Sequence, residues 1–158
     1  MRAGIGYDIH RFEEGRRLIL GGVEIAGEIG LAGHSDADVL LHAIIDALLG
    51  AAGLRDIGHH FPPDDPQWRN ASSLDLLART LALMHEAGFA VENVDATVIA
   101  ERPRLSPHIP AMRDRIAGAL DIDGARVNVK ATTHEGLGAL GRGEGMAAVA
   151  VATLRGRD

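Results

Sequence analysis

The chain of 158 residues has the length of a single domain and can bury a core without covalent cross-links. It contains no cysteine, which excludes disulfides, thiolate metal sites and cysteine nucleophiles. Its net charge of −6 and its aromatic content of 3% provide neither the attraction nor the stacking surfaces of a nucleic-acid binder. No targeting or membrane segment is recognisable, so we expect one cytoplasmic domain over residues 1–158 with no membrane or nucleic-acid partner.

The predicted elements indicate an α+β domain with helices on one face of a mostly antiparallel sheet. In chain order they are a strand over 2–10, a hairpin over 18–25, a helix over 36–49, a loop over 56–66, a helix over 72–85, a strand over 91–100, a helix over 110–120, a strand over 126–131, a glycine-rich loop over 136–145 and a strand over 146–154. Ser35 and Asp38 are expected to cap the first helix and Gly50 to end it. Ser72 and Asp75 are expected to cap the second helix.

Asp8 and His10 lie two residues apart in the first strand, so both side chains point to the same side of the sheet. Such a pair is also typical of a simple ion pair. His42, however, lies in an otherwise apolar helix, between Asp38 and Asp46 on one stripe. One carboxylate and two imidazoles can hold a divalent ion with open coordination positions, and they suit zinc or non-haem iron. We hypothesise that Asp46 or Asp38 orients the His42 ring.

The segment 136–141 matches the dinucleotide pattern G-x-G-x-x-G, but no helix is predicted after it, so we reject a dinucleotide site. Just before it, residues 130–135 combine hydroxyls with a carboxylate. That combination suits a phosphate with a metal ion attached, or an ordinary turn. Arg142 and Glu144 are likewise compatible with a local ion pair.

Taken together, several stretches resemble the 2-C-methyl-D-erythritol 2,4-cyclodiphosphate synthase family of the non-mevalonate isoprenoid pathway. They are residues 4–10, 20–23, 34–38 with His42, 56–58 with Phe61-Pro62, 93–95, 107–110, 127–133 and 141–145. The resemblance implies a ferredoxin-like subunit in a homotrimer, with active sites between neighbouring subunits. It implies a phosphorus–oxygen lyase that converts 4-diphosphocytidyl-2-C-methyl-D-erythritol 2-phosphate to the 2,4-cyclodiphosphate and CMP. The 2-phosphate would attack the β-phosphorus in a metal-templated, intramolecular step.

The resemblance also implies roles for individual residues, by their position in the matching stretches. Zinc would be held by Asp8, His10 and His42, and a second ion, Mg²⁺ or Mn²⁺, by Glu135; His34 and Thr133 would be catalytic. The methylerythritol phosphate would contact Ser35, Asp56, Ile57, Gly58, Phe61, Pro62, Pro63, Asp64 and Asp65. The cytidine pocket, from the adjacent subunit, would comprise Ala100, Glu101, Arg102, Pro103, Arg104, Leu105, Ser106, Ala131, Thr132 and Thr133. Further substrate contacts would be Asp8, Ile9, His10, His34, His134, Glu135, Ala139 and Arg142.

Four residues depart from the family's usual pattern: Pro63, Arg104, His134 and Ala139. None of them is among the expected zinc ligands. Two alternative functions stay open at this point. The same ligands could activate water in a metal-dependent phosphodiesterase. The chain could also form a non-enzymatic trimeric scaffold that binds isoprenoid diphosphates around a structural metal.

Overall fold

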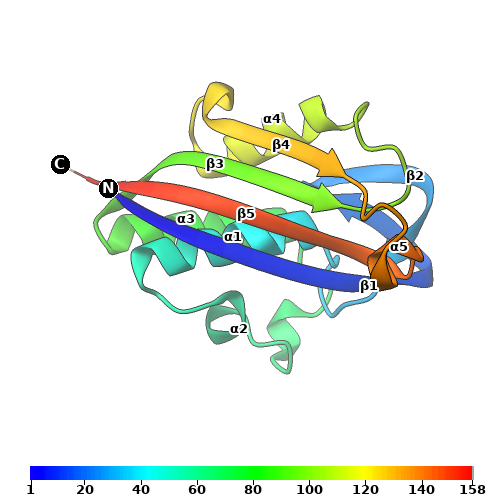
Figure 1. The fold of residues 1–158 in the computed structure, drawn as a ribbon. Coiled ribbons are helices and arrows are strands. Elements are labelled where there is room, and N and C mark those ends of the chain that lie inside the picture. Colours follow the sequence, from blue (N-terminus) through cyan, green and yellow to red (C-terminus); the bar gives the residue numbers. More distant parts are fainter. Residues whose placement is uncertain (158) are drawn as a thin grey trace.

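A computed structural model describes residues 1–157 as a five-stranded sheet backed by helices (Figure 1). The elements are β1 (Arg2–Leu20), β2 (Val23–Leu31), α1 (Val39–Ala52), α2 (Ile57–His60), a 3₁₀ turn (Pro66–Trp68), α3 (Ser73–Glu86), β3 (Phe89–Ile99), α4 (Ile109–Leu120), a 3₁₀ turn (Gly124–Arg126), β4 (Val127–Thr132), α5 (Gly138–Gly141) and β5 (Gly145–Gly156). The α+β class is therefore confirmed. Within the described residues, no helix is both long and apolar enough to cross a membrane.

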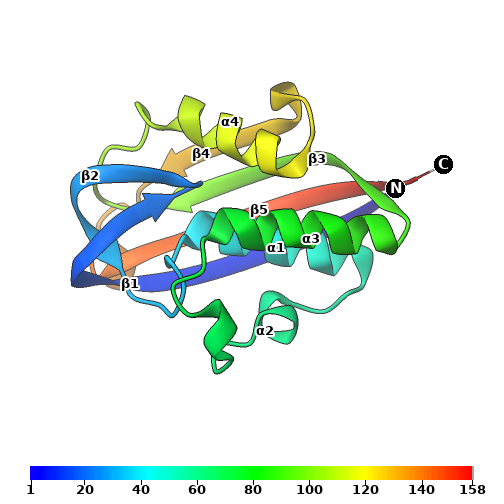
Figure 2. The ribbon, with the colours of Figure 1, turned by 180° about the vertical axis from the view of Figure 1, so that it is seen from behind.

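The sheet is mixed, which corrects the expectation of a mostly antiparallel one. Its strand order is β2-β1-β5-β3-β4. β1 pairs antiparallel with β2 and β5, and β5 pairs antiparallel with β3. β3 and β4 are parallel, because α4 carries the chain back across the sheet between them. Figure 2 shows α1, α3 and α4 together on one face, as expected from the sequence.

Two glycines allow α1 to lie directly on β1. A Cβ atom at Gly4 would be 2.2 Å from the carbonyl oxygen of Ala47, and one at Gly6 would be 1.8 Å from that of Ala43. No side chain fits in such a gap, so the helix backbone rests on the strand backbone. Nearly every residue of α1 is buried, which explains its almost continuous apolar sequence. This contact sets the distance between the functional residues of β1 and those of α1.

Asp38 joins the start of α1 to the β1–β2 hairpin. Its buried carboxylate accepts hydrogen bonds from the backbone N–H groups of Leu41 (3.0 Å), Gly21 (3.0 Å) and Gly22 (2.8 Å). Both glycines have positive φ angles, as a tight two-residue turn requires. The hairpin, in which Leu20 pairs with Val23, is confirmed. Asp38 is thus the helix N-cap and also the support of the turn.

Several predicted boundaries are wrong. Gly50 lies inside α1, and the helix ends at Ala52, followed by the C-cap Gly53 with its left-handed φ of 74°. Ser72 is the N-cap of α3 but its side chain makes no capping hydrogen bond. β1 continues to Leu20, and the loops predicted over 56–66 and 136–145 contain the short helices α2 and α5.

Candidate metal centre

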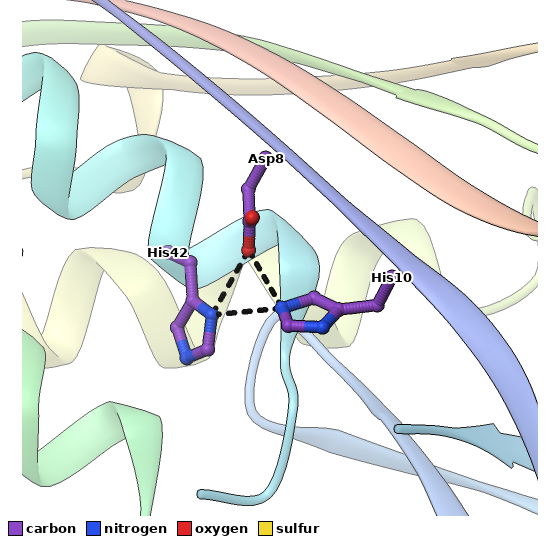
Figure 3. Close-up of side chains that lie close together, drawn as sticks. All are labelled: Asp8, His10 and His42. Atoms are coloured by element: carbon purple, nitrogen blue, oxygen red, sulfur yellow. Dashed lines mark hydrogen bonds and ion pairs between the residues drawn. The ribbon is translucent and has the colours of Figure 1, made fainter. Parts of the chain in front are cut away.

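Asp8, His10 and His42 converge on one point between β1 and α1 (Figure 3). The Asp8 Oδ2 atom lies 2.8 Å from His10 Nε2 and 3.0 Å from His42 Nδ1. The two ring nitrogens are 3.3 Å apart. The side chains of all three residues are largely buried. The structure therefore brings together the three residues that the sequence predicted as metal ligands.

The three ligand atoms have the spacing of one face of a tetrahedral metal site. A zinc ion bound at 2.0–2.1 Å keeps its tetrahedral ligands about 3.3 Å apart. The three distances between Asp8, His10 and His42 are 2.8, 3.0 and 3.3 Å, at or somewhat below this value. Three protein ligands also leave a fourth position for a substrate oxygen, as in catalytic zinc sites. The residues present fit a divalent metal ion.

The electrostatics of the group favour a cation. Burial by itself raises the pKa of Asp8, but hydrogen bonds from His10 and His42 outweigh it and hold that pKa well below its usual range. The hydrogen bond to Asp8 raises the pKa of His10, although burial opposes the change. The carboxylate is therefore ionised, which is the form that binds a metal ion.

Hydroxyl groups contact the far side of the His42 ring. His42 Nε2 lies 3.0 Å from Ser73 Oγ and 3.2 Å from Ser35 Oγ. Ser73 donates its hydroxyl proton to the carboxylate of Asp36 and its backbone N–H to the other oxygen of that carboxylate at 2.9 Å. Because the Ser73 proton is already donated, its oxygen accepts the Nε2 proton of His42. With Nε2 donating to Ser73, a metal ion at Nδ1 would have to displace only the Nδ1 proton that His42 donates to Asp8.

The hypothesis that Asp38 or Asp46 orients His42 is wrong. The Asp38 carboxylate faces the hairpin turn, as described above. Asp46 accepts a hydrogen bond from the N–H of Ile57 at 2.8 Å and so fixes the start of α2. Asp38, His42 and Asp46 follow one another at four-residue spacing along one side of the helix. Each nevertheless meets a different neighbour: the hairpin turn, the candidate metal centre and the start of α2.

A cavity of about 220 Å³ opens beside the candidate metal centre. Its walls are mostly apolar, and they are formed by His10, Gly33, His34, Ser35, His42, Ile57, Gly58, Phe61, Pro63, Trp68 and Leu76. Seven of the residues predicted to contact substrate are in this wall: His10, two from the 34–35 segment and four from the 57–63 segment. Asp56 lies at the N-cap of α2, where its side chain accepts from the N–H of His59 at 2.9 Å. Pro62, Asp64 and Asp65 belong to the same segment but not to the wall.

Sequence reasoning missed Gly33, Trp68 and Leu76. Trp68 is the only tryptophan of the chain, and its ring packs edge-on against Phe61 at a centroid distance of 5.1 Å. An aromatic residue so close to the predicted substrate segment is the signal that could have indicated it. Leu76 lies on the buried face of α3, where nothing in the local sequence distinguishes a cavity wall from the core.

A second cavity, of about 320 Å³, lies at the ends of β3 and β4. It is lined by Ala100, Glu101, Pro103, Arg104, Leu105, Ser106, Ala131, Thr132 and Thr133. These are nearly all the residues predicted for the cytidine pocket; Arg102 instead lines a neighbouring depression with Pro103 and Phe12. The second cavity shares no residue with the cavity beside the metal centre.

The loop after β4 is held by Glu101. The Glu101 carboxylate accepts a hydrogen bond from the backbone N–H of His134 at 2.7 Å. Glu135 adopts a positive φ of 52°, and Thr133 Oγ1 donates to its carboxylate at 3.3 Å. Glu135 stands outside the group formed by Asp8, His10 and His42. The loop therefore presents a hydroxyl and a carboxylate together, away from the metal centre of the same chain.

The last predicted contacts lie near the turn from α5 to β5. Ala139 lines a depression that also includes Ile9 and His10. Arg142 Nε donates to the Glu144 carboxylate at 2.6 Å, so the local ion pair considered from the sequence is present. The Arg142 side chain is largely exposed.

Comparisons with known proteins agree with this geometry. The YgbB family model matches residues 1–155. The chain belongs to the YgbB family. It is 59% identical to the 2-C-methyl-D-erythritol 2,4-cyclodiphosphate synthase of Symbiobacterium thermophilum, over 99% of this chain and all of that protein. It is 62% identical to the synthase of the same name from Gloeobacter violaceus, over 98% of this chain and 94% of that protein.

Solved structures of the family have the same fold. The bifunctional IspDF of Campylobacter jejuni is 46% identical, with a TM-score of 0.96 over 99% of this chain, which spans 42% of that longer protein. A CDP complex of IspF from Plasmodium falciparum is 34% identical, with a TM-score of 0.86 over 99% of this chain and 97% of that one. The recognition made from the sequence is thereby confirmed.

Proposed function

We infer that this protein catalyses the cyclodiphosphate synthase reaction of the non-mevalonate isoprenoid pathway. The substrate is 4-diphosphocytidyl-2-C-methyl-D-erythritol 2-phosphate, and the products are 2-C-methyl-D-erythritol 2,4-cyclodiphosphate and CMP. One observation carries the inference: a chain of this family brings Asp8, His10 and His42 together, at the edge of a cavity, as a group that could hold a metal ion. As a phosphorus–oxygen lyase, it would need no water as a reactant.

The reaction exchanges one phosphorus–oxygen bond for another. An oxygen of the 2-phosphate forms a bond to the β-phosphorus. The bond from that phosphorus to the oxygen that bridges it to the α-phosphorus breaks, and this oxygen leaves as part of CMP. The attacking phosphate monoester already carries a charge of about −1.5 to −2 at pH 7, so it requires no general base. The main tasks of the protein are then to position two anionic groups and to stabilise charge at phosphorus.

We propose that Asp8, His10 and His42 hold zinc, and that Glu135 holds a second ion, Mg²⁺ or Mn²⁺, at the diphosphate. The bound cations supply positive charge that offsets the repulsion between the phosphates. The carboxylate and the two imidazoles support this proposal because three ligands at these distances match a tetrahedral site. For Glu135, the support is its exposed carboxylate beside the Thr133 hydroxyl.

The remaining roles belong to polar groups on the cavity walls. His34 and Thr133 would donate hydrogen bonds to oxygens on the β-phosphorus as charge develops there. Ser35 accepts the N–H of Ala37 at 3.1 Å, and its own proton can be donated to a phosphate oxygen. The apolar wall around Ile57 and Phe61 excludes water, which favours cyclisation over hydrolysis.

We also propose that a complete active site requires two subunits of a homotrimer of ferredoxin-like chains. Ile9 of β1 and Ile99 of β3 both pair with Ala147 of β5, and Ile99 also pairs with Thr132 of β4. The end of β4 therefore lies three strands from the part of β1 that carries His10, about 14 Å at ordinary strand spacing. The cytidine segments after β3 and β4 form their own cavity. A substrate that occupies both kinds of cavity is more simply bound between the cavity beside the metal centre of one chain and the cytidine cavity of a neighbouring chain.

The open face of the sheet supports self-association. Four large apolar side chains of β1 and β5 are exposed on it: Ile5 (70%), Tyr7 (55%), Ile9 (48%) and Val151 (42%). On β1 they alternate with Gly4, Gly6, Asp8 and His10, which face α1. A contiguous apolar strip of this kind is typical of a protein–protein interface, and a second copy of the chain would cover it.

The test is CMP release from the cytidylylated substrate by the purified protein supplied with zinc and magnesium. We expect turnover that is abolished by a chelator and restored by both ions. His42→Ala should lose at least 10³-fold in turnover, which is typical when a centre that stabilises the transition state is removed. The control is His85→Ala, on α3 away from the site, which should retain turnover. A wild-type protein that binds the substrate but releases no CMP would contradict the inference and favour the scaffold.

A further inference from the structure

The segment 33–35, which carries His34 and Ser35 into the cavity, belongs to no helix or strand. Its backbone carbonyl groups are therefore satisfied by other partners. The backbone carbonyl of His34 accepts a hydrogen bond from the backbone N–H of Asn70 at 2.8 Å. The carbonyl groups on either side, those of Gly33 and Ser35, are bound by one side chain, Arg16 on β1.

Arg16 forms two short hydrogen bonds with this segment. Its Nη1 donates to the carbonyl of Gly33 at 2.8 Å and its Nη2 to that of Ser35 at 2.7 Å. Both distances are in the range of charge-assisted hydrogen bonds. The planar guanidinium group fixes the separation and direction of its two donors, so it holds the two carbonyls in a single arrangement. His34 lies between them and is held from both sides.

A β-bulge in β1 directs Arg16 towards the segment. The pairing of β1 with β2 shifts register between Glu13 and Arg17 and again between Arg17 and Leu18, and Gly15 has a φ of 80°. Bulges of this kind bend a strand and redirect a side chain. Arg16 is largely buried as a result, whereas Arg17 next to it is 73% exposed and pairs with Glu24 at 3.2 Å on the surface. Two adjacent arginines thus have different environments.

We propose that Arg16 is a positioning residue for the reaction: it holds the 33–35 segment so that His34 and Ser35 meet the substrate phosphates. The proposal rests on the function inferred above. Arg16 forms no hydrogen bond to Asp8, His10 or His42, so its loss acts first on the placement of the segment. Its positive charge also lies beneath a segment that faces an anionic substrate.

The test compares Arg16→Ala, Arg16→Lys and the matched control Arg17→Ala by CMP release and by zinc affinity in a chelator competition. Misplacing catalytic groups by about 1 Å costs up to about 10²-fold. We therefore expect kcat/KM of Arg16→Ala to fall 10- to 100-fold with zinc affinity within threefold of wild type. Arg16→Lys should lose less, because one ammonium can bind one of the two carbonyls. Arg17→Ala should stay within twofold in both measurements.

Two further measurements separate positioning from a general loss of structure. Guanidinium added at low concentration should restore part of the turnover of Arg16→Ala, since it can reoccupy the space between the two carbonyls, and should have no such effect on Arg17→Ala. Amide hydrogen exchange over residues 33–37 should accelerate at least tenfold in Arg16→Ala and not in Arg17→Ala. Failure of wild-type turnover would refute the proposed function, and the exchange data would then decide on Arg16. Unchanged exchange, or turnover of Arg16→Ala within twofold of wild type, would overturn the proposal.

Discussion

Replacing Gly6 by alanine should damage both the fold and the metal centre. The added Cβ would lie 1.8 Å from the Ala43 carbonyl oxygen and 2.7 Å from the Ala47 nitrogen, both of them backbone atoms of α1. Because non-bonded atoms need about 3.5 Å, α1 must move from β1 by about 1.5 Å. Overpacking of this size costs about 3 kcal/mol of unfolding free energy. His42 moves with the helix, whereas metal sites tolerate only about 0.2 Å, so zinc affinity should fall at least tenfold.

Gly50→Ala is the control, because it adds the same methyl group on the α1 side of the contact with β1, where it meets no close backbone atom. Gly50 is exposed, and the nearest atom to its added Cβ is the Ile5 carbonyl oxygen at 3.9 Å. Alanine is favoured over glycine inside a helix by about 0.5–1 kcal/mol, so this variant should be more stable than wild type. Urea unfolding followed by circular dichroism gives the stabilities, and chelator competition gives the zinc affinities. If Gly6→Ala stays within 0.5 kcal/mol and twofold of wild type, the contact of helix and strand does not set the site.

Other residues give two further predictions. Ser73→Ala removes the acceptor of the His42 Nε2 proton and should weaken zinc binding about tenfold by chelator competition, because partners of metal-bound histidines contribute at this level. Ser72→Ala, with no capping bond to lose, should bind zinc as wild type does, and equal affinities for both variants would contradict the hydroxyl's role. Burial raises the pKa of Asp38 to about 6, so the folded protein keeps a proton that the unfolded chain releases near pH 4. The free energy of unfolding should therefore fall by up to about 3 kcal/mol between pH 4 and pH 7, and urea titrations of Asp38→Asn should lack this component; the same fall in both proteins would refute the assignment.

The predictable features of the fold are those that depend on residues close together in the sequence. Paired glycines at 21 and 22 predicted the hairpin, because few other residues adopt their backbone angles. The end of α1 was misplaced since an exposed glycine such as Gly50 is tolerated within a helix. Which of the two glycines, Gly50 or Gly53, ends the helix depends on tertiary contacts. The parallel pairing of β4 with β3 likewise follows from where α4 packs, which the sequence pattern does not encode.

The candidate metal centre could be predicted because its ligands obey simple periodicities. Asp8 and His10 share a strand face, and His42 stands out as a polar residue in a buried helix. The partners of His42 could not be predicted in the same way. Ser73 comes from another helix, 31 residues along the chain, and is bound in turn by Asp36. Periodicity within one helix favoured Asp38 and Asp46, but tertiary packing turned both towards backbone N–H groups.

Phosphorus NMR of the reaction products tests the central claim most directly. The purified, zinc- and magnesium-loaded protein is incubated with 4-diphosphocytidyl-2-C-methyl-D-erythritol 2-phosphate until CMP release is complete. Intramolecular attack predicts two coupled signals from one ring diphosphate together with one equivalent of CMP, with no oxygen from labelled water in the ring. An open-chain product that carries an oxygen from water would show that the same three ligands serve a phosphodiesterase, and would contradict the account.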